Sequence, residues 1–448
     1  MKRNKTIYMN TNTRIFFWSL IVALGGFLFG FDTAVISGVE KSLQELFVMS
    51  PFMHGFAISS ALIGTVIGAL VVGKPTDIIG RKPMLYLIAL CYVISAIGTA
   101  LAINLSMFIF LRFLGGLAIG ASSVVAPMYI SEISPANVRG KMTALFQLNV
   151  IVGIMMAFIS NYLLRDVGES AWRWMLGVET FPAVAWLLLL LLVPESPRYL
   201  IKINDEIKAR TIFEKTGIKD IDHEITEIRK NLSQKQGKLF SRVYFNPIFI
   251  VFLVAMFNQF SGINAILYFA PRIFELSGMS QKMAFFQPVI IGVTNAFFTL
   301  LGMLIVDKVG RRSLLIVGST GMSIFLGLVS LSFFSVGIPN HYLLWFLVGY
   351  IMFFAFSTGT VIWVLISEVF PNSVRGKGQS FGSFTHWFFA ALITFLFPVI
   401  SSGFQYGTAF VFLFFCIMTV AHAIVAWLYF PETKGRTIES ISNDLSGG

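Results

Sequence analysis

Long apolar segments alternate with short polar ones along almost the whole chain. A helix needs about 20 consecutive apolar residues to cross the roughly 30 Å hydrocarbon core of a bilayer. The segments that meet this length lie at 15–39, 54–74, 84–103, 106–130, 143–164, 172–193, 247–270, 283–306, 313–336, 341–367, 378–402 and 406–430. The pattern therefore predicts an all-α membrane protein with twelve transmembrane helices.

The polar segments between these helices occur in matching pairs. Residues 131–141 read SEISPANVRGK and residues 367–377 read SEVFPNSVRGK, at an offset of 236. Two further pairs keep nearly the same offset: 77–82 (DIIGRK) with 307–312 (DKVGRR), and 194–196 (PES) with 431–433 (PET). A membrane chain built from two similar halves is typical of transporters whose site lies between the halves.

Basic residues are distributed unevenly between the two sides of the predicted spans. Of the 33 Lys and Arg, one lies inside a span, a few lie in the loops opposite to the termini, and all the others lie on the side of the termini. Those in the opposite loops are Lys41, Arg165, Arg173, Arg272 and Lys282. Because cytoplasmic loops are enriched in Lys and Arg, both termini are predicted to be cytoplasmic. The same asymmetry explains the net charge of +11, so we expect no binding of nucleic acid.

The repeat and the hydropathy together predict three parts. We expect an N-terminal six-helix bundle at 1–194, a cytoplasmic linker at 195–246, and a C-terminal six-helix bundle with a short cytoplasmic tail at 247–448. The linker alternates charged residues with apolar ones, a pattern typical of amphipathic helices that lie under the membrane. Linker helices that contact both bundles would be able to hold the cytoplasmic opening between the bundles closed.

Two charged residues lie deep inside the predicted spans. Asp32 is seven residues before the outer end of span 15–39, and Arg112 is six residues after the outer end of span 106–130. At 1.5 Å per helical residue both lie roughly 10 Å below the outer surface, so their side chains are expected to meet. One interpretation is a permanent ion pair. The other is proton coupling, because a change in their separation alters how firmly the carboxylate holds a proton.

Neutral polar and aromatic side chains are frequent in the central parts of the spans. They are Gln147, Asn149, Asn258, Gln259, Asn264, Tyr268, Asn295, Trp363, His386 and Trp387. Carboxamides both donate and accept hydrogen bonds, and aromatic faces suit the C–H faces of a sugar ring. The set indicates a neutral, polyhydroxylated ligand, although each amide is also suited to joining two helices. His386 is either a second proton site or a residue that packs beside Trp387.

A third group of charged residues is expected at the cytoplasmic helix ends. Its members are Asp77, Arg81, Glu132, Arg139, Asp307, Arg311, Glu368 and Arg375. Ion pairs at wet helix ends are worth about 1 kcal/mol, weak enough to break in each cycle, so we expect these residues to act as a gate. No nucleophile, phosphate loop or metal-ligand spacing accompanies them. We therefore expect no enzyme activity, no catalytic residue, no metal and no cofactor.

Several motifs together resemble the sugar porter family of the major facilitator superfamily. The matching segments are GGFLFGFDT at 25–33, RFLGG at 112–116, PESPRYL at 194–200, NQFSGIN at 258–264, DKVGRR at 307–312 and PETKG at 431–435. The resemblance spans nearly the whole chain. It implies the major facilitator fold of two pseudo-symmetric six-helix bundles, with a central sugar site and alternating access.

The resemblance also assigns expected roles to residues of this chain. The implied sugar contacts are Gln147, Gln259, Asn264, Asn295 and Trp363, together with Phe29, Asn258, Tyr268 and Trp387. The bacterial xylose/proton symporters are the most similar members, because their proton-linked aspartate and its arginine partner match Asp32 and Arg112. Mammalian facilitative glucose carriers have an asparagine at the aspartate position, which favours proton symport here.

Two positions depart from the family pattern. The family commonly has a Gln-Gln pair where this chain has Asn258 and Gln259, so one hydrogen bond to the sugar is lost or re-aimed. The family usually has Gly-Pro where this chain has Gly359 and Thr360. Proline breaks a helix, so without it we expect the gating bend of this span to rest on Gly359 alone.

These observations predict import of a monosaccharide, a pentose or a hexose, by proton symport. An uncoupled facilitative carrier of a sugar or polyol is the alternative, in which Asp32 and Arg112 form a structural pair. Xylose, glucose, galactose, arabinose and inositol all fit the amide set. We expect a monomer in a bacterial inner membrane whose partners are the monosaccharide, the proton and the lipid bilayer.

Overall fold

The computed structural model describes residues 11–135, 138–218, 220–233, 237–334, 338–371, 373–436, 440–441 and 444–445. All regular secondary structure in these ranges is helical. Twelve helical segments are long and apolar enough to cross a membrane, so the predicted fold class is confirmed. Several helices begin or end a few residues away from the predicted limits, because helices continue past the apolar part of a span.

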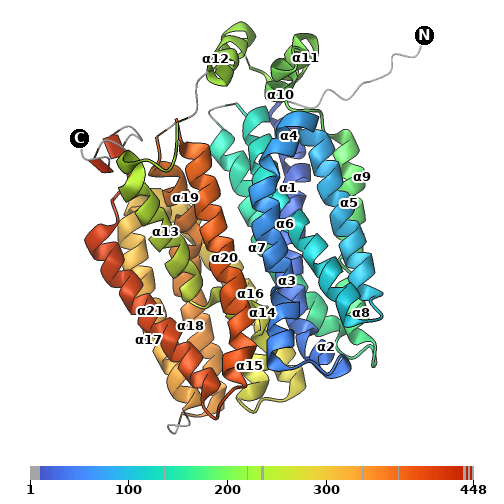
Figure 1. Cartoon of the computed structure of the whole chain (residues 1–448), viewed down its shortest axis with the longest axis vertical. Coiled ribbons are helices and arrows are strands. Elements are labelled where there is room, and N and C mark those ends of the chain that lie inside the picture. The colour runs from blue at the N-terminus through green and yellow to red at the C-terminus, as the bar shows by residue number, and fades with distance from the viewer. Residues whose placement is uncertain are drawn as a thin grey trace.

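The first six spanning segments form one half of the molecule. They are α1 (Thr11–Val35), α3 (Pro51–Val71), α5 (Arg81–Ala100), α6 (Leu105–Ile133), α7 (Arg139–Leu164), and α8 (Ala171–Gly177) with α9 (Thr180–Leu189). The short elements of this half are η1 (Ile36–Gly38), α2 (Glu40–Leu46), α4 (Gly73–Ile79) and η2 (Leu190–Leu192). Its helices run from blue to green in Figure 1 and stand side by side.

The other six segments form the second half. They are α13 (Phe245–Phe260) with α14 (Ile263–Tyr268), α16 (Gln281–Val309), α17 (Arg311–Phe333), α18 (Leu343–Phe356) with α19 (Thr358–Glu368), α20 (Arg375–Ser401) and α21 (Gly407–Tyr429). The short elements are η3 (Arg242–Tyr244), α15 (Ala270–Leu276) and η4 (Asn340–Tyr342). The two halves meet where α3 packs on α20 and α7 packs on α16.

Three short helices join the halves: α10 (Pro197–Lys202), α11 (Glu206–Thr216) and α12 (Ile221–Ser233). They share a small apolar core that includes Phe213, Ile225 and Ile228. Figure 1 shows them at one end of the first half, which we call the linker end; the opposite end, near α2 and α15, is the loop end. The guanidinium of Arg14 in α1 donates to the carbonyl oxygen of Lys215 in α11 at 3.4 Å. These helices therefore lie where the sequence predicted an amphipathic linker.

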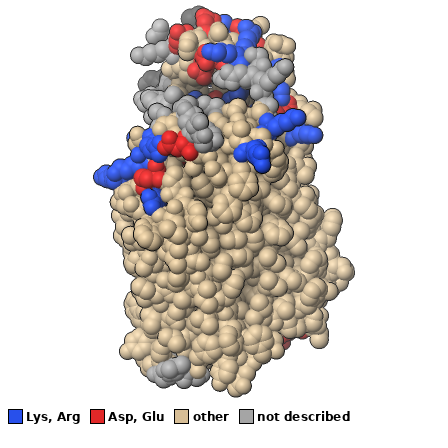
Figure 2. Space-filling view, turned by 60° about the vertical axis from the view of Figure 1, so that its left-hand side comes forward, with Lys and Arg blue, Asp and Glu red and all other residues tan. Residues whose placement is uncertain are grey.

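Charged side chains are concentrated at the linker end. Figure 2 shows Lys and Arg gathered there, above a broad surface of uncharged residues. The last described residues also lie at this end, since Asn246 Nδ2 donates to the carbonyl oxygen of Leu445 at 3.0 Å. The molecule therefore has the apolar belt and the charged cap of a multi-pass membrane protein.

The seventh span is interrupted at Gly262, between α13 and α14. Its φ is +86°, a left-handed conformation that glycine adopts readily and other residues rarely adopt. A Cβ atom at this position would lie 2.3 Å from the ring of Phe415. Glycine therefore allows both the turn and the close packing, and the break lets Asn264 reach back to Gln259.

The tenth span is interrupted at Ser357, so the expectation that its bend rests on Gly359 was wrong. Ser357 has φ −115° and ψ −95°, outside the helical region, whereas α19 already includes Gly359. The Ser357 hydroxyl donates to the carbonyl oxygen of Phe353 at 2.5 Å, and the Thr360 hydroxyl to that of Ala355 at 2.8 Å. Hydroxyl groups thus satisfy the carbonyls at the break, and no proline is needed.

Candidate functional site

Asp32 in α1 and Arg112 in α6 meet inside the first half, as the sequence predicted. Arg112 Nη1 lies 2.5 Å from Asp32 Oδ1, and the side chains are only 1% and 5% exposed. Such a pair is strongly destabilised if either partner is removed, because the remaining charge is then buried and unpaired. The contact is compatible with both interpretations of the pair, structural and proton-coupling.

A third acidic or basic residue, Glu179, lies directly beside this pair, although it was not among the residues predicted from the sequence. Glu179 precedes α9, is 3% exposed and interacts with the Asp32 carboxyl group. Within the described structure, Asp32 Oδ2 and Glu179 Oε1 are both buried without a hydrogen-bond donor. Two carboxyl groups and one guanidinium are thus buried together inside the first half. Glu179 could have been found from the sequence, because it is an acidic residue inside the predicted span 172–193.

The carboxamides near the Gly262 break form one connected group in the second half. Gln259 Nε2 donates to Asn258 Oδ1 at 2.9 Å. Asn264 Nδ2 donates to Gln259 Oε1 at 2.6 Å, across the turn between α13 and α14. All three residues are less than a tenth exposed. The break therefore brings both sides of the seventh span into one polar cluster.

Aromatic side chains from α19 and α20 border this cluster. The ring of His386 packs against both Trp363 and Trp387, with centroid distances of 4.9 Å and 4.6 Å. Phe29 of α1 packs edge-on against Trp387 at 5.3 Å, so both halves contribute to the site. Among described residues, the buried Trp387 Nε1 has no hydrogen-bond partner, which leaves a donor available to a ligand. His386 was predicted either to carry a proton or to pack beside Trp387, and the structure shows that it does pack there.

Tyr268 connects the amide cluster to the charged group. It is fully buried on α14, lies near Arg112 and Asp32, and is one helical turn from Asn264. Its hydroxyl group has no hydrogen-bond partner within the described residues. The short helix α14 thus carries sugar-binding candidates and lies next to the proton-linked pair.

The remaining amide candidates lie on neighbouring helices. Gln147 of α7 is half-buried, and Asn149 in the same helix donates to the carbonyl oxygen of Leu145 at 2.9 Å. Asn295 of α16 is buried and accepts a hydrogen bond from Thr299 at 3.5 Å. The interactions of the described residues tie neither Gln147 nor Asn295 to the Gln259 cluster. Asn149 bonds within its own helix, which is the structural alternative for an amide in a span.

Comparison with known proteins decides what kind of molecule carries this site. The family described as "Sugar (and other) transporter" matches residues 18–445. The chain belongs to this family. It is 34% identical to the D-xylose-proton symporter of Escherichia coli (strain K12), over 97% of this chain and 96% of that protein. It is 35% identical to the arabinose-proton symporter of Bacillus subtilis (strain 168), over 94% of this chain and 93% of that protein.

Solved structures agree with this assignment. The inward open conformation of the xylose transporter XylE from E. coli matches with a TM-score of 0.86 and 33% identity, covering 95% of this chain and 99% of that one. XylE bound to 6-bromo-6-deoxy-D-glucose matches with a TM-score of 0.81. The major facilitator fold and the resemblance to the sugar porters are thus confirmed. The relatives are transporters, and this sugar porter belongs to a transport family and not to a family of enzymes.

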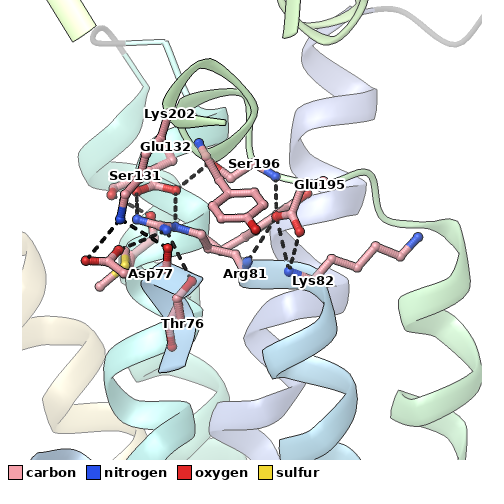
Figure 3. Close-up of polar contacts among 12 residues, drawn as sticks. Thr76, Asp77, Arg81, Lys82, Ser131, Glu132, Glu195, Ser196 and Lys202 are labelled. Carbon is pink, nitrogen blue, oxygen red and sulfur yellow. Dashed lines mark hydrogen bonds and ion pairs between the residues drawn. The ribbon is translucent and has the colours of Figure 1, made fainter. Parts of the chain in front are cut away.

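The charged motifs at the linker end form one network in each half. In the first half, Arg81 Nε and Nη2 each lie 2.9 Å from a Glu132 oxygen, and Arg81 Nη1 lies 3.1 Å from Asp77 Oδ1 (Figure 3). The Ser196 hydroxyl donates to Glu132 at 2.5 Å. In the second half, the Arg311 guanidinium contacts Glu368 and Asp307, each at 2.9 Å. The sequence repeat is therefore also a repeat of contacts.

A glutamate from the third repeated motif completes each network. Glu195 accepts hydrogen bonds from the backbone N–H of Arg81 at 3.1 Å and of Lys82 at 3.2 Å, at the start of α5 (Figure 3). Burial raises the pKa of the Glu195 carboxyl, and the N–H groups of Ser196, Lys82 and Arg81 oppose that rise. Glu432 binds the start of α17 in the same way, at 2.9 Å from the Arg311 nitrogen. Both carboxylates satisfy N–H groups that have no partner within their helix.

The gating candidates Arg81 and Glu132 pair with each other within the first half, and Arg311 pairs with Glu368 within the second half. Arg139 Nε donates to the carbonyl oxygen of Ser134 at 3.3 Å, in the turn before its own helix. Pairing across the halves at the linker end is a property expected of a different conformation, so the gating role stays a prediction.

Proposed function

We propose that this protein imports a pentose or hexose together with a proton, by alternating access. The observation that carries the proposal is the placement of the buried Asp32, Arg112 and Glu179 next to a neutral amide and aromatic cluster. The first group is suited to binding and releasing a proton, and the second to binding a neutral sugar. The names of the relatives, a xylose-proton and an arabinose-proton symporter, support both parts.

In this proposal Asp32 carries the proton and Arg112 sets its affinity. When Arg112 is close, the carboxylate is stabilised and the proton leaves; when the pair separates, the buried carboxyl group recovers a proton. Glu179 holds a second carboxyl group at the same place and can share that proton. Tyr268 links this group to Asn264, so closure of α14 around a sugar would alter the surroundings of Asp32.

The sugar site in this proposal combines residues of both halves. Its members are Gln147, Gln259, Asn264, Asn295, Trp363, Asn258, Tyr268, Trp387 and Phe29. The buried donors of Tyr268 and Trp387 that lack a described partner would bond sugar hydroxyl groups, and the faces of Trp363 and Trp387 would cover its C–H groups. None of these sugar-site residues carries a charge that would favour an ionic substrate.

Alternating access requires the two halves to move relative to one another. We infer that 1–194 and 247–448 are the moving units and that 195–246 joins them. The linker end carries most of the basic residues, so we assign it and both termini to the cytoplasm of a bacterium, with the protein as a monomer in the inner membrane. Inward opening would then occur at the linker end.

The repeated networks at the linker end supply a prediction about gating. Replacing Glu132 and Glu368 together with Gln is expected to shift the resting population toward the state open at the linker end. The reason is that these carboxylates can form ion pairs across the halves when that end closes, each worth about 1 kcal/mol. Spin labels at Lys74 and Lys308 should then lie farther apart on average.

The control for this experiment is Glu214→Gln, which removes an exposed carboxylate from α11. It is expected to leave the distance distribution as in the unmodified protein. If the double variant behaves like this control, the networks only cap helices and do not gate.

The decisive experiment for the proposed function is uptake of labelled sugars in proteoliposomes. Xylose, arabinose, glucose, galactose and inositol are offered with and without an imposed pH gradient. Accumulation of at least one sugar only in the presence of the gradient is the expected result. Uptake that merely equilibrates under both conditions would instead establish the uncoupled carrier.

A further inference from the structure

The amide of Gln259 is held on every side by other side chains. Its oxygen accepts from Asn264 Nδ2 at 2.6 Å, and its nitrogen donates to Asn258 Oδ1 at 2.9 Å. The same nitrogen lies 3.2 Å from Nδ1 and 3.0 Å from Nε2 of His386. A position this close to both ring nitrogens lies over the face of the imidazole, so the NH₂ group contacts the ring face and not an in-plane lone pair.

This contact favours a neutral imidazole at His386, because an N–H group is attracted to the electron-rich face of an uncharged ring. A protonated ring would instead place a positive charge against the NH₂ group of Gln259. Rotating the Gln259 amide would place its NH₂ group against the NH₂ group of Asn264. His386 is also only 7% exposed and packs against two indoles, surroundings that favour an uncharged group.

Building on the proposed sugar site, we propose that His386 is a positioning residue that acts through Gln259. As a neutral ring that packs against Trp363 and Trp387, it fixes which end of the Gln259 amide faces α20 and which end faces α14. The site then offers a bound sugar a defined order of acceptor and donor groups. A hydroxyl pattern that matches this order binds well, so His386 contributes to specificity without needing to touch the sugar.

A double-mutant cycle with D-xylose as the probe tests this proposal. His386→Leu removes the aromatic face that the Gln259 amide contacts, and should weaken binding in calorimetric titrations by roughly tenfold. In a Gln259→Leu background the same change should alter the affinity by less than about twofold. His386→Phe, which keeps an aromatic face, should retain most of the affinity. Equal effects of His386→Leu in both backgrounds would show that His386 acts independently of Gln259 and would overturn the proposal.

A measurement without sugar separates this inference from the proposed function. Nitrogen NMR of the sugar-free protein, labelled at histidine, should show a neutral ring at His386. Its ring nitrogen signals should move in Gln259→Leu, because the amide no longer lies over the ring. A protonated ring, or a signal unchanged by Gln259→Leu, would contradict the positioning role even if every sugar binds. If no sugar in the panel binds the unmodified protein, the proposed function fails and the NMR result still decides the role of His386.

An independent cluster lies at the loop end, where the halves touch. Glu40 of α2 is 1% exposed, and its carboxylate lies 2.8 Å from His54 Nε2 of α3 and 2.8 Å from Arg272 Nε of α15. Arg272 Nη2 also donates to Gln44 at 2.5 Å. Since α2 and α3 belong to the first half and α15 to the second, this carboxylate joins the two halves.

A second ion pair and close packing accompany this cluster. Lys41 Nζ lies 2.6 Å from Glu275 Oε2, again between α2 and α15. A Cβ atom at Gly55 of α3 would lie 2.2 Å from the backbone oxygen of Phe395 in α20, so these helices are in direct contact. At the linker end, by contrast, the described networks of Arg81 and Arg311 stay within their own halves.

We infer that Glu40, His54 and Arg272 form a latch that keeps the loop end closed while the linker end is open. Opening the loop end would separate a buried carboxylate from its guanidinium partner, which is costly until water reaches both groups. The similarity to an inward open structure agrees with a latch that is engaged in this conformation. The latch would thus bias the resting equilibrium toward the inward open state.

Distance measurements at the loop end test the latch. Spin labels at Ile103 and Phe404, in a background without Cys91 and Cys416, report the separation of the halves there. Arg272→Gln should increase the population with long distances at least several-fold, and Glu40→Gln should do the same if Arg272→Gln fails to fold. Lys282→Gln, which removes another exposed loop-end charge, serves as the matched control. Distributions in both latch variants that equal those of the control would overturn the inference.

Discussion

Replacing Asp32 with Asn is expected to abolish accumulation of sugar against its gradient while sugar binding and exchange stay measurable. An asparagine fills the same space as the aspartate but cannot take up or release a proton, so sugar movement is no longer tied to the proton gradient. The amide and aromatic cluster is not altered by this change. Uptake into proteoliposomes under an imposed pH gradient, together with exchange of labelled sugar at equal concentrations, measures the two properties separately.

A matched control is Asp166→Asn at the loop end. Asp166 is exposed and pairs with Arg165, far from the buried pair, and its loss should leave accumulation unchanged. If the Asp32 variant still concentrates sugar when only a pH gradient is supplied, Asp32 does not carry the proton. In that case Glu179, the other buried carboxyl group of the site, becomes the residue to replace.

Replacing Gln259 with Ala is expected to raise the sugar dissociation constant roughly tenfold or more. Loss of a hydrogen-bonding partner for a buried polar group costs about 1–3 kcal/mol, and each 1.4 kcal/mol corresponds to a factor of ten in affinity. The effect should be larger than for a single contact, because Asn258, Asn264 and His386 lose the amide that orders them. Calorimetric titration with the best substrate of the uptake panel measures the change.

Gln287→Ala provides the comparison for this variant. Gln287 is also a buried glutamine in a spanning helix, but its amide nitrogen contacts the sulfur of Met279 near the loop end. Its removal should leave sugar affinity within about twofold of the unmodified protein, since it makes no contact with the amide cluster. An unchanged affinity in Gln259→Ala would remove this residue from the sugar site.

The twelve spans, the duplication and the contact between Asp32 and Arg112 could all be predicted from the sequence. A bilayer requires every spanning helix to have a similar length and an apolar composition. Each span can therefore be recognised in the sequence as one continuous apolar segment. Equal depth in two antiparallel helices was enough to bring Asp32 and Arg112 together. The repeated motifs likewise predicted equivalent charged residues in the two halves, because the same local sequence places them at the same helix ends.

The tertiary structure alone decided which distant residues share a site. Glu179 joins Asp32, His386 joins Gln259, and Glu40 joins Arg272, each across more than 100 positions of the chain. No local pattern records such pairs, because they depend on how helices from different parts of the chain pack. The break at Ser357 was decided in the same way, since a hydroxyl group ends a helix only where the neighbouring helix leaves room, as Gly318 does here. The apolar composition of the sequence thus determined where the helices lie and how deep their polar residues sit in the membrane. Packing between helices determined which of these polar and charged side chains contact one another.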